Sequence, residues 1–417
     1  METINKFLPY LTKMGDNKIL KSVRDGLSFT IPFTIVGSVF LIIGNFPIDA
    51  WIKFITPYSG QLNSMVTVTF GVLGLISAIG VGYSLAVNYD LEPLTNTVIT
   101  VLAFLLLTVD KEWAIVPANL GASGMFTAIL AGIVTMLVTR FVTKKDWTIK
   151  MPDGVPPAVA KSFSSLTPAA IALTIVWIVR VLFQIDINQI LQIVFKPLVF
   201  GLNTIPGLMV YTFVALGLWT FGIHGPNLLS GIATPIFLTN IAANMEAFQA
   251  GRPIPNEVAE GFWTLFMNIG GSGATIGLVI AMIFAKSKSY RELGKLSLPS
   301  AIFCINEPII FGFPIVMNPI MAIPFVATPT ILGVATIILM RLGLVGHIVL
   351  QVPWTMPPII GPYLATNGNI GAAIWSLCTI AISYGIYFPF FKALDRKQAA
   401  LEKDLDEQTD GNLEVEV

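Results

Sequence analysis

Charged side chains are scarce in this sequence. Only 12% of its 417 residues are Asp, Glu, Lys or Arg, and 54% are hydrophobic, whereas soluble domains carry roughly 25% charged residues. Several apolar runs approach the ~20 residues that a helix needs to cross a bilayer. The composition excludes an ordinary soluble domain and predicts a polytopic membrane protein. Because basic and acidic residues number 24 each, the zero net charge gives no sign of a nucleic-acid partner.

Residues that build metal, redox and nucleotide sites are also scarce. The two cysteines, Cys304 and Cys378, lie in apolar sequence without C-x-x-C spacing, which favours a packing role. The sequence has no zinc-ligand spacing, no G-x-x-x-x-G-K-S/T phosphate loop and no Arg-rich segment typical of a voltage sensor. No series of acidic and basic residues indicates a proton relay. We expect no cofactor and no metal, so transport energy has to come from a partner, a less obvious ion site or the solute gradient.

Ten apolar runs are candidates for transmembrane helices, because a helix bonds its backbone within its own segment. These runs are 26–46, 66–87, 94–109, 121–139, 166–184, 207–222, 228–245, 261–285, 319–340 and 370–391. Between the fifth and sixth runs, residues 187–206 contain Pro197 and Pro206 and predict a short interfacial helix. The fold class is therefore an all-α integral membrane protein with about ten crossings.

Basic residues between the runs indicate the orientation. They form four clusters: Lys6 to Arg24 before the first run, Arg140 to Lys161 after the fourth, Lys286 to Lys295 after the eighth, and Lys392 to Lys397 after the tenth. The loop at 47–65 carries only Lys53. Basic residues concentrate in cytoplasmic loops. We therefore expect a multi-pass protein of the bacterial cell membrane with both termini in the cytoplasm.

The two ends of the chain are polar in different ways. The basic N-terminus lacks a compact apolar core with a cleavage site, so we expect no cleaved signal peptide. Its apolar residues Phe7, Leu8, Leu11 and Met14 predict a short amphipathic helix on the membrane surface. Residues 395–417 are polar and acidic and predict a disordered cytoplasmic tail.

Two further apolar segments do not fit as crossings. Residues 296–318 (SLPSAIFCINEPIIFGFPIVMNP) and 352–366 (VPWTMPPIIGPYLAT) are rich in Pro and Gly, and either one as a crossing would break the charge parity. We predict two re-entrant hairpins. Such backbone survives at membrane depth only where protein buries it or a watery cavity adjoins it. Residues 186–394 are therefore expected to form the transport half, and residues 1–185 a scaffold.

Glu307, in INEPIIFG, is the ionisable group that most needs an explanation. Charges within a membrane are costly and usually face a cavity or a partner. One interpretation is that its carboxylate only caps nearby backbone donors in the hairpin. We favour a ligand-binding acceptor, with the amide of Asn306 beside it.

His224, in FGIHGPN, lies where an apolar run is broken by Gly225 and Pro226. Broken helices expose backbone and side chains to solutes, so we favour a functional imidazole with Asn227 beside it over a structural one. His347, near the predicted outer surface, is interpreted as structural.

Aromatic residues in the second half offer an apolar platform for a neutral sugar. Trp354 lies within the second hairpin and Trp219 precedes His224. Aromatic faces suit sugar C–H groups, and carboxylate, amide and imidazole groups suit its hydroxyls. Trp263 is interpreted as an interfacial anchor, and Arg180 as a side chain that snorkels to the outer surface.

Four motifs carry a resemblance to a known family. They are FGIHGPN at 221–227, INEPIIFG at 305–312, NPIMAIPF at 318–325 and VPWTMPP at 352–358. With them the chain resembles enzyme IIC, the membrane subunit of the bacterial phosphoenolpyruvate-dependent sugar phosphotransferase system. Within the lactose/cellobiose family it looks most similar to the branch for cellobiose or diacetylchitobiose, and the resemblance covers nearly the whole chain.

The resemblance implies a function that composition does not reach. Members are homodimers with ten transmembrane helices per chain; the first five form the dimer contact, and the rest hold the sugar with two hairpins. The C6 hydroxyl of the sugar is phosphorylated from a cysteine of the IIB protein, which IIA, HPr and enzyme I supply indirectly. By resemblance, Glu307 and His224 lie near that hydroxyl. Nothing after the last run could form a IIB domain, so we expect the donor on a separate chain.

Two rival functions stay open from the sequence. An ion-coupled secondary transporter would deliver unmodified sugar, and an integral membrane enzyme would act on lipid or glycan without transport. Under the favoured function, Glu307 either removes the hydroxyl proton or only binds the sugar.

Overall fold

The computed structural model describes residues 17–45, 49–152, 154–156, 160, 163–313, 315–316 and 318–413. In this part of the chain all regular elements are helical, apart from an isolated β-bridge between Val109 and Ile115. The predicted N-terminal surface helix with Phe7, Leu8, Leu11 and Met14 lies outside the described residues.

Contacts divide the chain into two units. The first comprises Met1–Phe200 and Asn227–Pro255, and the second comprises Gly201–Pro226 and Asn256–Val417. The predicted boundary at residue 185 was drawn by function, and the scaffold and transport roles of the two halves stay predictions. The contact division differs because α12 continues to residue 202 and α14 packs with the first unit.

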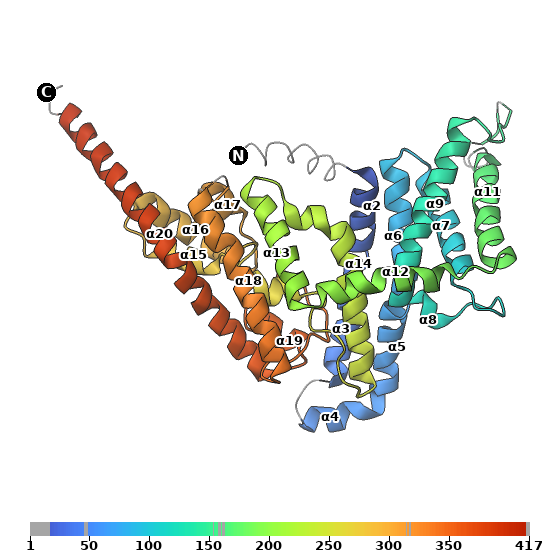
Figure 1. Cartoon of the computed structure of the whole chain (residues 1–417), viewed down its shortest axis with the longest axis horizontal. Helices are drawn as coiled ribbons and strands as arrows, with labels where there is room; N and C mark the ends of the chain where they lie inside the picture. The colour runs from blue at the N-terminus through green and yellow to red at the C-terminus, as the bar shows by residue number, and fades with distance from the viewer. Residues whose placement is uncertain are drawn as a thin grey trace. The chain divides into compact units, whose positions relative to one another are not determined.

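The helices of the first unit are shown in Figure 1 and run in chain order. They are α2 (Lys18–Ser28), α3 (Ile31–Asn45), α4 (Asp49–Ile55), η1 (Thr56–Tyr58), α5 (Ser59–Phe70), α6 (Leu73–Asn88), α7 (Pro93–Thr108), α8 (Pro117–Leu120), η2 (Ala122–Gly124), α9 (Met125–Lys144), α11 (Leu166–Trp177), η3 (Ile178–Leu182), α12 (Ile187–Leu202) and α14 (Gly225–Gln249), the last two reaching the unit's edges.

Helix α6 is central to the first unit, since it packs against α2, α7 and α9. Small residues allow close approach: a Cβ on Gly26 would lie 2.5 Å from the Cα of Val81, and one on Gly80 would lie 2.2 Å from the carbonyl oxygen of Gly26. Helices in lipid associate through such close packing and through hydrogen bonds. The Thr100 and Thr135 hydroxyls, 2.7 Å apart, supply one such bond between α7 and α9.

The second unit holds the remaining helices. They are α13 (Ile205–Thr220), η4 (Trp263–Met267), α15 (Ile276–Ile283), α16 (Lys288–Ile302), α17 (Glu307–Gly312), α18 (Pro319–Arg341), α19 (Ile360–Ala365) and α20 (Ile370–Leu413). Its core surrounds a loop at 268–275, where the fully buried Tyr387 of α20 donates its hydroxyl to the carbonyl of Gly273 at 2.7 Å.

Six helices among the described residues are long and apolar enough to cross a membrane, or seven if one bent pair counts as a span. That pair is 166–182 with 187–202, bent by 85°. Two shorter apolar helices, α7 and α13, match predicted runs. The all-helical membrane fold is confirmed, while the count of ten crossings stays a prediction.

Two local predictions are wrong. The run at 261–285 is not one helix, because positive φ angles at Gly270, Gly271 and Gly273 separate η4 from α15. The tail predicted to be disordered continues α20 as a helix from 395 to 413.

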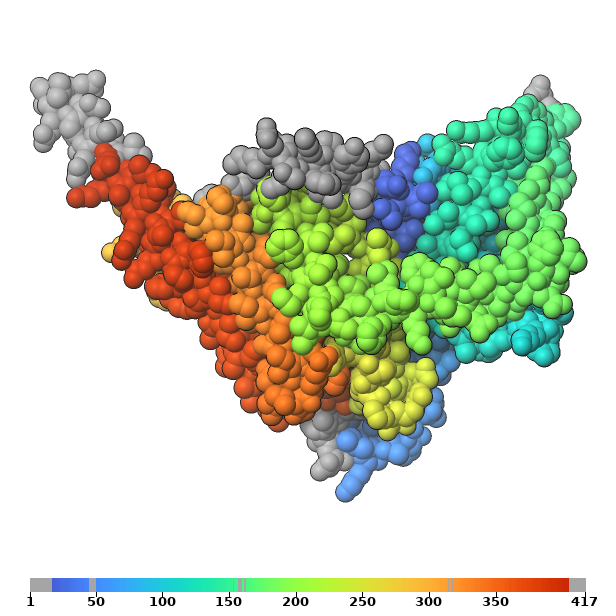
Figure 2. Space-filling view, viewed as in Figure 1, coloured from blue at the N-terminus to red at the C-terminus, as the bar shows by residue number. Residues whose placement is uncertain are grey.

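Helix α12 follows the predicted interfacial segment. In Figure 2 it lies at the molecular surface, and the side chains of Ile193, Val194 and Phe200 are 62%, 62% and 69% exposed. Such an outward apolar face suits contact with lipid. Its depth in a bilayer stays a prediction.

Candidate functional site

Helix α17 carries Glu307 at its first position. After α16 ends, the chain turns through Cys304, whose φ is +61°. Pro308 suits the first turn of a helix, because its φ is already helical and its missing N–H would have no partner there. Ile309 and Ile310 are buried and fix the helix to the core. The predicted first hairpin is thus a helix, a turn and a short helix, and its re-entry into the bilayer stays a prediction.

Asn306 ties the start of α17 to the glycine loop. Its side-chain N–H₂ donates to the carbonyl of Ser272 and to the hydroxyl of Thr275, both at 2.8 Å, and the residue is only 5% exposed. Gly271 leaves the room for it, since a Cβ there would lie 2.3 Å from Asn306 Cγ. Both amide hydrogens are therefore used within the protein, and direct binding of sugar by Asn306 stays a prediction.

The carboxylate of Glu307 faces outward. The residue is exposed, and within the described part of the chain its side chain makes no hydrogen bond or ion pair. The described residues give no support to the alternative in which it merely caps backbone donors. An accessible carboxylate with free lone pairs can accept hydrogen bonds from hydroxyl groups.

His224 lies in the break between α13 and α14. Gly222, with a φ of +82°, reverses the chain there, and the imidazole lies against Trp219 with ring centroids 4.5 Å apart at 48°. Trp219 is 7% exposed, and its indole N–H has no hydrogen-bond partner among the described residues. A buried donor without a partner is unusual in proteins and indicates a missing acceptor.

The break and α17 belong to one packed region. Trp219 shares a hydrophobic cluster with Ile309 and Ile310 of α17. A Cβ on Gly222 would lie 3.6 Å from a methyl carbon of Val316. The structure therefore brings the two motifs of the sequence prediction side by side.

The segment with Trp354 adjoins the same region. The Cys304 sulfur lies 3.9 Å from the carbonyl oxygen of Met356. Trp354 itself is 52% exposed, as expected of a side chain available to a ligand. Ile359, with a φ of +73°, donates its N–H to the Ser376 hydroxyl of α20 at 2.9 Å, which holds the segment in place.

The other singled-out residues lie apart from this region or support the fold. Asn227 is exposed in the first turn of α14 and is the first residue that contacts assign to the other unit. Trp263 packs against Tyr211, with ring centroids 4.9 Å apart, and His347 is partly buried in a loop.

Arg180 corrects a prediction. It was expected to snorkel outward, but its side chain is only 4% exposed and donates to the carbonyl of Val109 at 2.5 Å. Asp186 lies 3.8 Å away. The guanidinium therefore satisfies a carbonyl just beyond the end of α7, where orphan acceptors need a donor.

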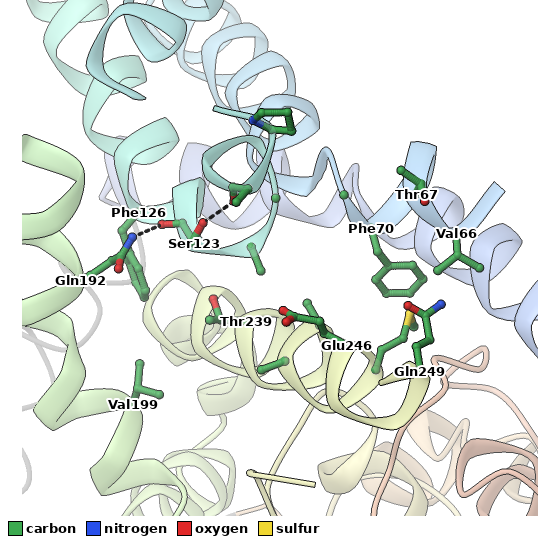
Figure 3. Close-up of a pocket in the computed structure, with 18 of the residues that line it drawn as sticks. Val66, Thr67, Phe70, Ser123, Phe126, Gln192, Val199, Thr239, Glu246 and Gln249 are labelled. Atoms are coloured by element: carbon green, nitrogen blue, oxygen red, sulfur yellow. Dashed lines mark hydrogen bonds between the residues drawn. The ribbon is translucent and has the colours of Figure 1, made fainter. Parts of the chain in front are cut away.

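The first unit has a cavity of its own. It measures about 690 Å³ and lies among α5, α12 and α14. In Figure 3 Gln192 donates to the carbonyl of Ser123, at 3.3 Å, and Phe70, Phe126 and Glu246 surround the space. None of the residues that the sequence singled out for sugar binding lines it.

Sequence reasoning missed the glycine loop. The run NIGGSGAT at 268–275 was visible, yet it was counted within a crossing. In the structure Asn268 accepts the N–H of Gly273 at 2.8 Å, and Ser383 donates to the carbonyl of Ala274 at 2.6 Å. The described residues contain no group of three His, Cys, Asp or Glu side chains that could hold a metal ion.

Comparisons with known proteins identify what the chain is similar to. The family model described as "Phosphotransferase system, EIIC" matches residues 24–329. The lichenan permease IIC component of Bacillus subtilis (strain 168) is 38% identical, over 96% of this chain and 94% of that protein. The cellobiose-specific EIIC component of Geobacillus stearothermophilus is 35% identical, over 96% and 95%.

A solved structure agrees with these sequences. The crystal structure of the transporter ChbC, the IIC component from the N,N'-diacetylchitobiose-specific phosphotransferase system, superimposes with a TM-score of 0.91. Its sequence is 35% identical, and the match covers 95% of this chain and 98% of that one.

Proposed function

Because this chain belongs to the phosphotransferase system EIIC family, we propose that it binds a β-linked disaccharide and presents its C6 hydroxyl to a phosphorylated donor protein. Membership makes the chain a multi-span permease subunit of that system. The relatives named for lichenan, cellobiose and N,N'-diacetylchitobiose support a sugar of the cellobiose or diacetylchitobiose type.

The observation that carries the proposal is the accessible carboxylate of Glu307 beside the His224 segment. Glu307 has no partner within the described residues, and α17 packs in the same cluster as Trp219. A carboxylate in hydrogen-bond reach of a hydroxyl can accept its proton as the oxygen attacks phosphorus. His224 orients the hydroxyl or offsets the negative charge that develops.

The aromatic residues give the sugar its platform. Trp354 is half exposed, and a ring face packs on the C–H face of a pyranose. The indole N–H of Trp219, which lacks a partner among the described residues, gains an acceptor when a sugar oxygen lies beside it. Asn306 and Asn227 are assigned amide contacts to the sugar.

The phosphoryl group comes from a cysteine of a separate IIB protein. Its S–P bond breaks, an O–P bond forms at the sugar C6 oxygen, and the hydroxyl proton passes to Glu307 before reaching water. IIA, HPr and enzyme I recharge the donor. We further propose a homodimer formed through residues 1–185, ten crossings with two re-entrant hairpins, and both termini in the cytoplasm, where four basic clusters would lie.

The test uses membrane vesicles that contain this protein and a labelled disaccharide. With phosphorylated IIB present, labelled sugar phosphate forms at a rate that rises with donor concentration. Without the donor, little label accumulates. Free sugar accumulating without IIB, and responding to an imposed cation gradient, contradicts the proposal and favours an ion-coupled transporter.

A further inference from the structure

Two carboxylates of α20 bind the start of α16. The backbone N–H groups of residues 286–289 are all engaged: the first two donate to Asp395, each at 2.9 Å, and the last two to Glu402, at 2.7 and 3.2 Å. The hydroxyls of Ser287 and Ser289 also donate to Glu402, both at 2.6 Å. We name this set of contacts the tail clamp.

The tail clamp is built from strong interactions. Hydrogen bonds to a carboxylate are shorter and roughly twice as strong as those between neutral groups. Negative charge is also stabilising at a helix N-terminus, where the first N–H groups lack partners within the helix. Asp395 and Glu402 are seven residues apart and so lie on one face of α20. Asp395 is only 5% exposed.

A cluster of three rings connects the tail clamp to α17. Tyr290, in the first turn of α16, lies 4.9 Å from Phe313 and 6.2 Å from Phe391 of α20, measured between ring centroids. Phe313 and Phe391 are 5.9 Å apart and almost fully buried. Because Phe313 directly follows α17, the rings join the end of α17 to the two helices that the tail clamp holds together (Figure 1).

Close packing between α16 and α17 completes the connection. A Cβ on Gly312 would lie 2.9 Å from a methyl carbon of Leu293, so α17 lies directly against α16. At its other end, α17 is fixed by the hydrogen bonds of Asn306 to the glycine loop. The position of Glu307 thus depends on contacts at both ends of a six-residue helix.

We propose that Asp395 and Glu402 are positioning residues for phosphoryl transfer. Acting through α16 and the three rings, they hold α17 so that the Glu307 carboxylate meets the sugar hydroxyl. This inference rests on the proposed function of Glu307. The link is a continuous chain of packed and hydrogen-bonded groups, and small displacements of a reacting group cost rate.

Cys304 provides a native probe of α17. It lies in the turn between α16 and α17, and Cys378 is the other cysteine in the sequence. In a Cys378→Ser background, the alkylation rate of Cys304 by a small thiol reagent reports how often this turn opens. Opening of the tail clamp in Asp395→Asn/Glu402→Gln should raise that rate on the order of tenfold.

Asp404→Asn is the matched control. Asp404 is exposed on the same end of α20 and makes no hydrogen bond or ion pair with the described residues. It should alkylate at the background rate. Where the double variant does not fold, the single variant Glu402→Gln is measured in its place and should also label faster.

The second readout is the kcat of sugar phosphate formation, which the tail clamp variants should lower about tenfold while the amount of folded protein is unchanged. Folded variants with unchanged Cys304 alkylation and unchanged kcat overturn the inference. A wild-type protein that makes no sugar phosphate with the donor instead refutes the proposed function. The two failures are therefore distinguishable.

Discussion

At the scale of single residues, Glu307 combines an exposed carboxylate with a rigidly held backbone. Its neighbours Asn306 and Ile309 are 5% and 0% exposed, so the chain on either side is fixed while the side chain is accessible. This arrangement suits proton acceptance from a bound hydroxyl, because a positioned base loses little entropy in the reaction.

Replacing Glu307 tests that role. Glu307→Gln keeps the size and removes the base, so the rate of sugar phosphate formation with phosphorylated IIB should fall by about 10²–10⁴-fold. Glu292→Gln is the control, since Glu292 is an exposed carboxylate paired with Lys295 at 2.7 Å. Turnover of Glu307→Gln near the wild-type rate excludes an essential carboxylate.

Gly271 supports Glu307 from a distance, and its effect can be separated from backbone strain. Gly271→Ala places a Cβ 2.3 Å from Asn306 Cγ at a φ of +99°, whereas Gly343→Ala, at a φ of +72°, meets nothing within 4 Å. Both carry a left-handed backbone cost of about 1–2 kcal/mol. Thermal unfolding in detergent should show a clearly larger loss for Gly271→Ala; equal losses would contradict the contact.

The sequence singles out Glu307 because a lone charge stands in an apolar run. It does not reveal the partners of Asn306, which lie 31 and 34 residues earlier in the chain. Nor does it show that the amide hydrogens of Asn306 are already used. Long-range pairing of this kind leaves no local pattern.

At the scale of elements, the end of α11 shows how a buried charge is accommodated. The π-helical turn Ile178–Leu182 carries Arg180 inward, where it meets the carbonyl of Val109 and the ring of Trp113, 5.9 Å from its centroid. A π-helical turn adds a residue per turn and redirects the side chains on it. Hydropathy alone favoured an outward Arg180 because it contains no information on this turn.

Arg180 should therefore be a stability residue. Arg180→Gln leaves the Val109 carbonyl without its charged donor and should lower the free energy of unfolding by about 1–3 kcal/mol. Arg252→Gln removes an ion pair with Glu246 in which the side chains are 60% and 76% exposed, and such exposed pairs contribute about 0–1 kcal/mol. Unfolding of both variants in detergent provides the comparison, and a neutral Arg180→Gln would contradict the buried role.

Helix α20 shows why composition misjudged the tail. Residues 395–417 are polar, and polarity without an apolar face is typical of disorder. Asp395 and Glu402 nevertheless find six donors at the start of α16, and Phe391 anchors the helix just before them. Partners more than 100 residues away in the chain stabilise this helix, so its own sequence does not predict it.

At the scale of the whole molecule, composition and four short motifs were enough for the class and the family. The all-helical membrane fold and the resemblance to enzyme IIC are both confirmed. The number of crossings was harder to predict, because the glycine loop interrupts one apolar run and an 85° bend divides another. Window hydropathy averages over both features.

The central claim is that phosphoryl transfer to the sugar C6 hydroxyl at the Glu307 site is the step that delivers the sugar. The most direct test follows labelled disaccharide in proteoliposomes with phosphorylated IIB on the predicted cytoplasmic side, and locates the product's phosphoryl group by NMR. The account predicts sugar phosphorylated at the nonreducing C6, in proportion to the donor consumed. Unmodified sugar delivered at the same rate with or without the donor would contradict it.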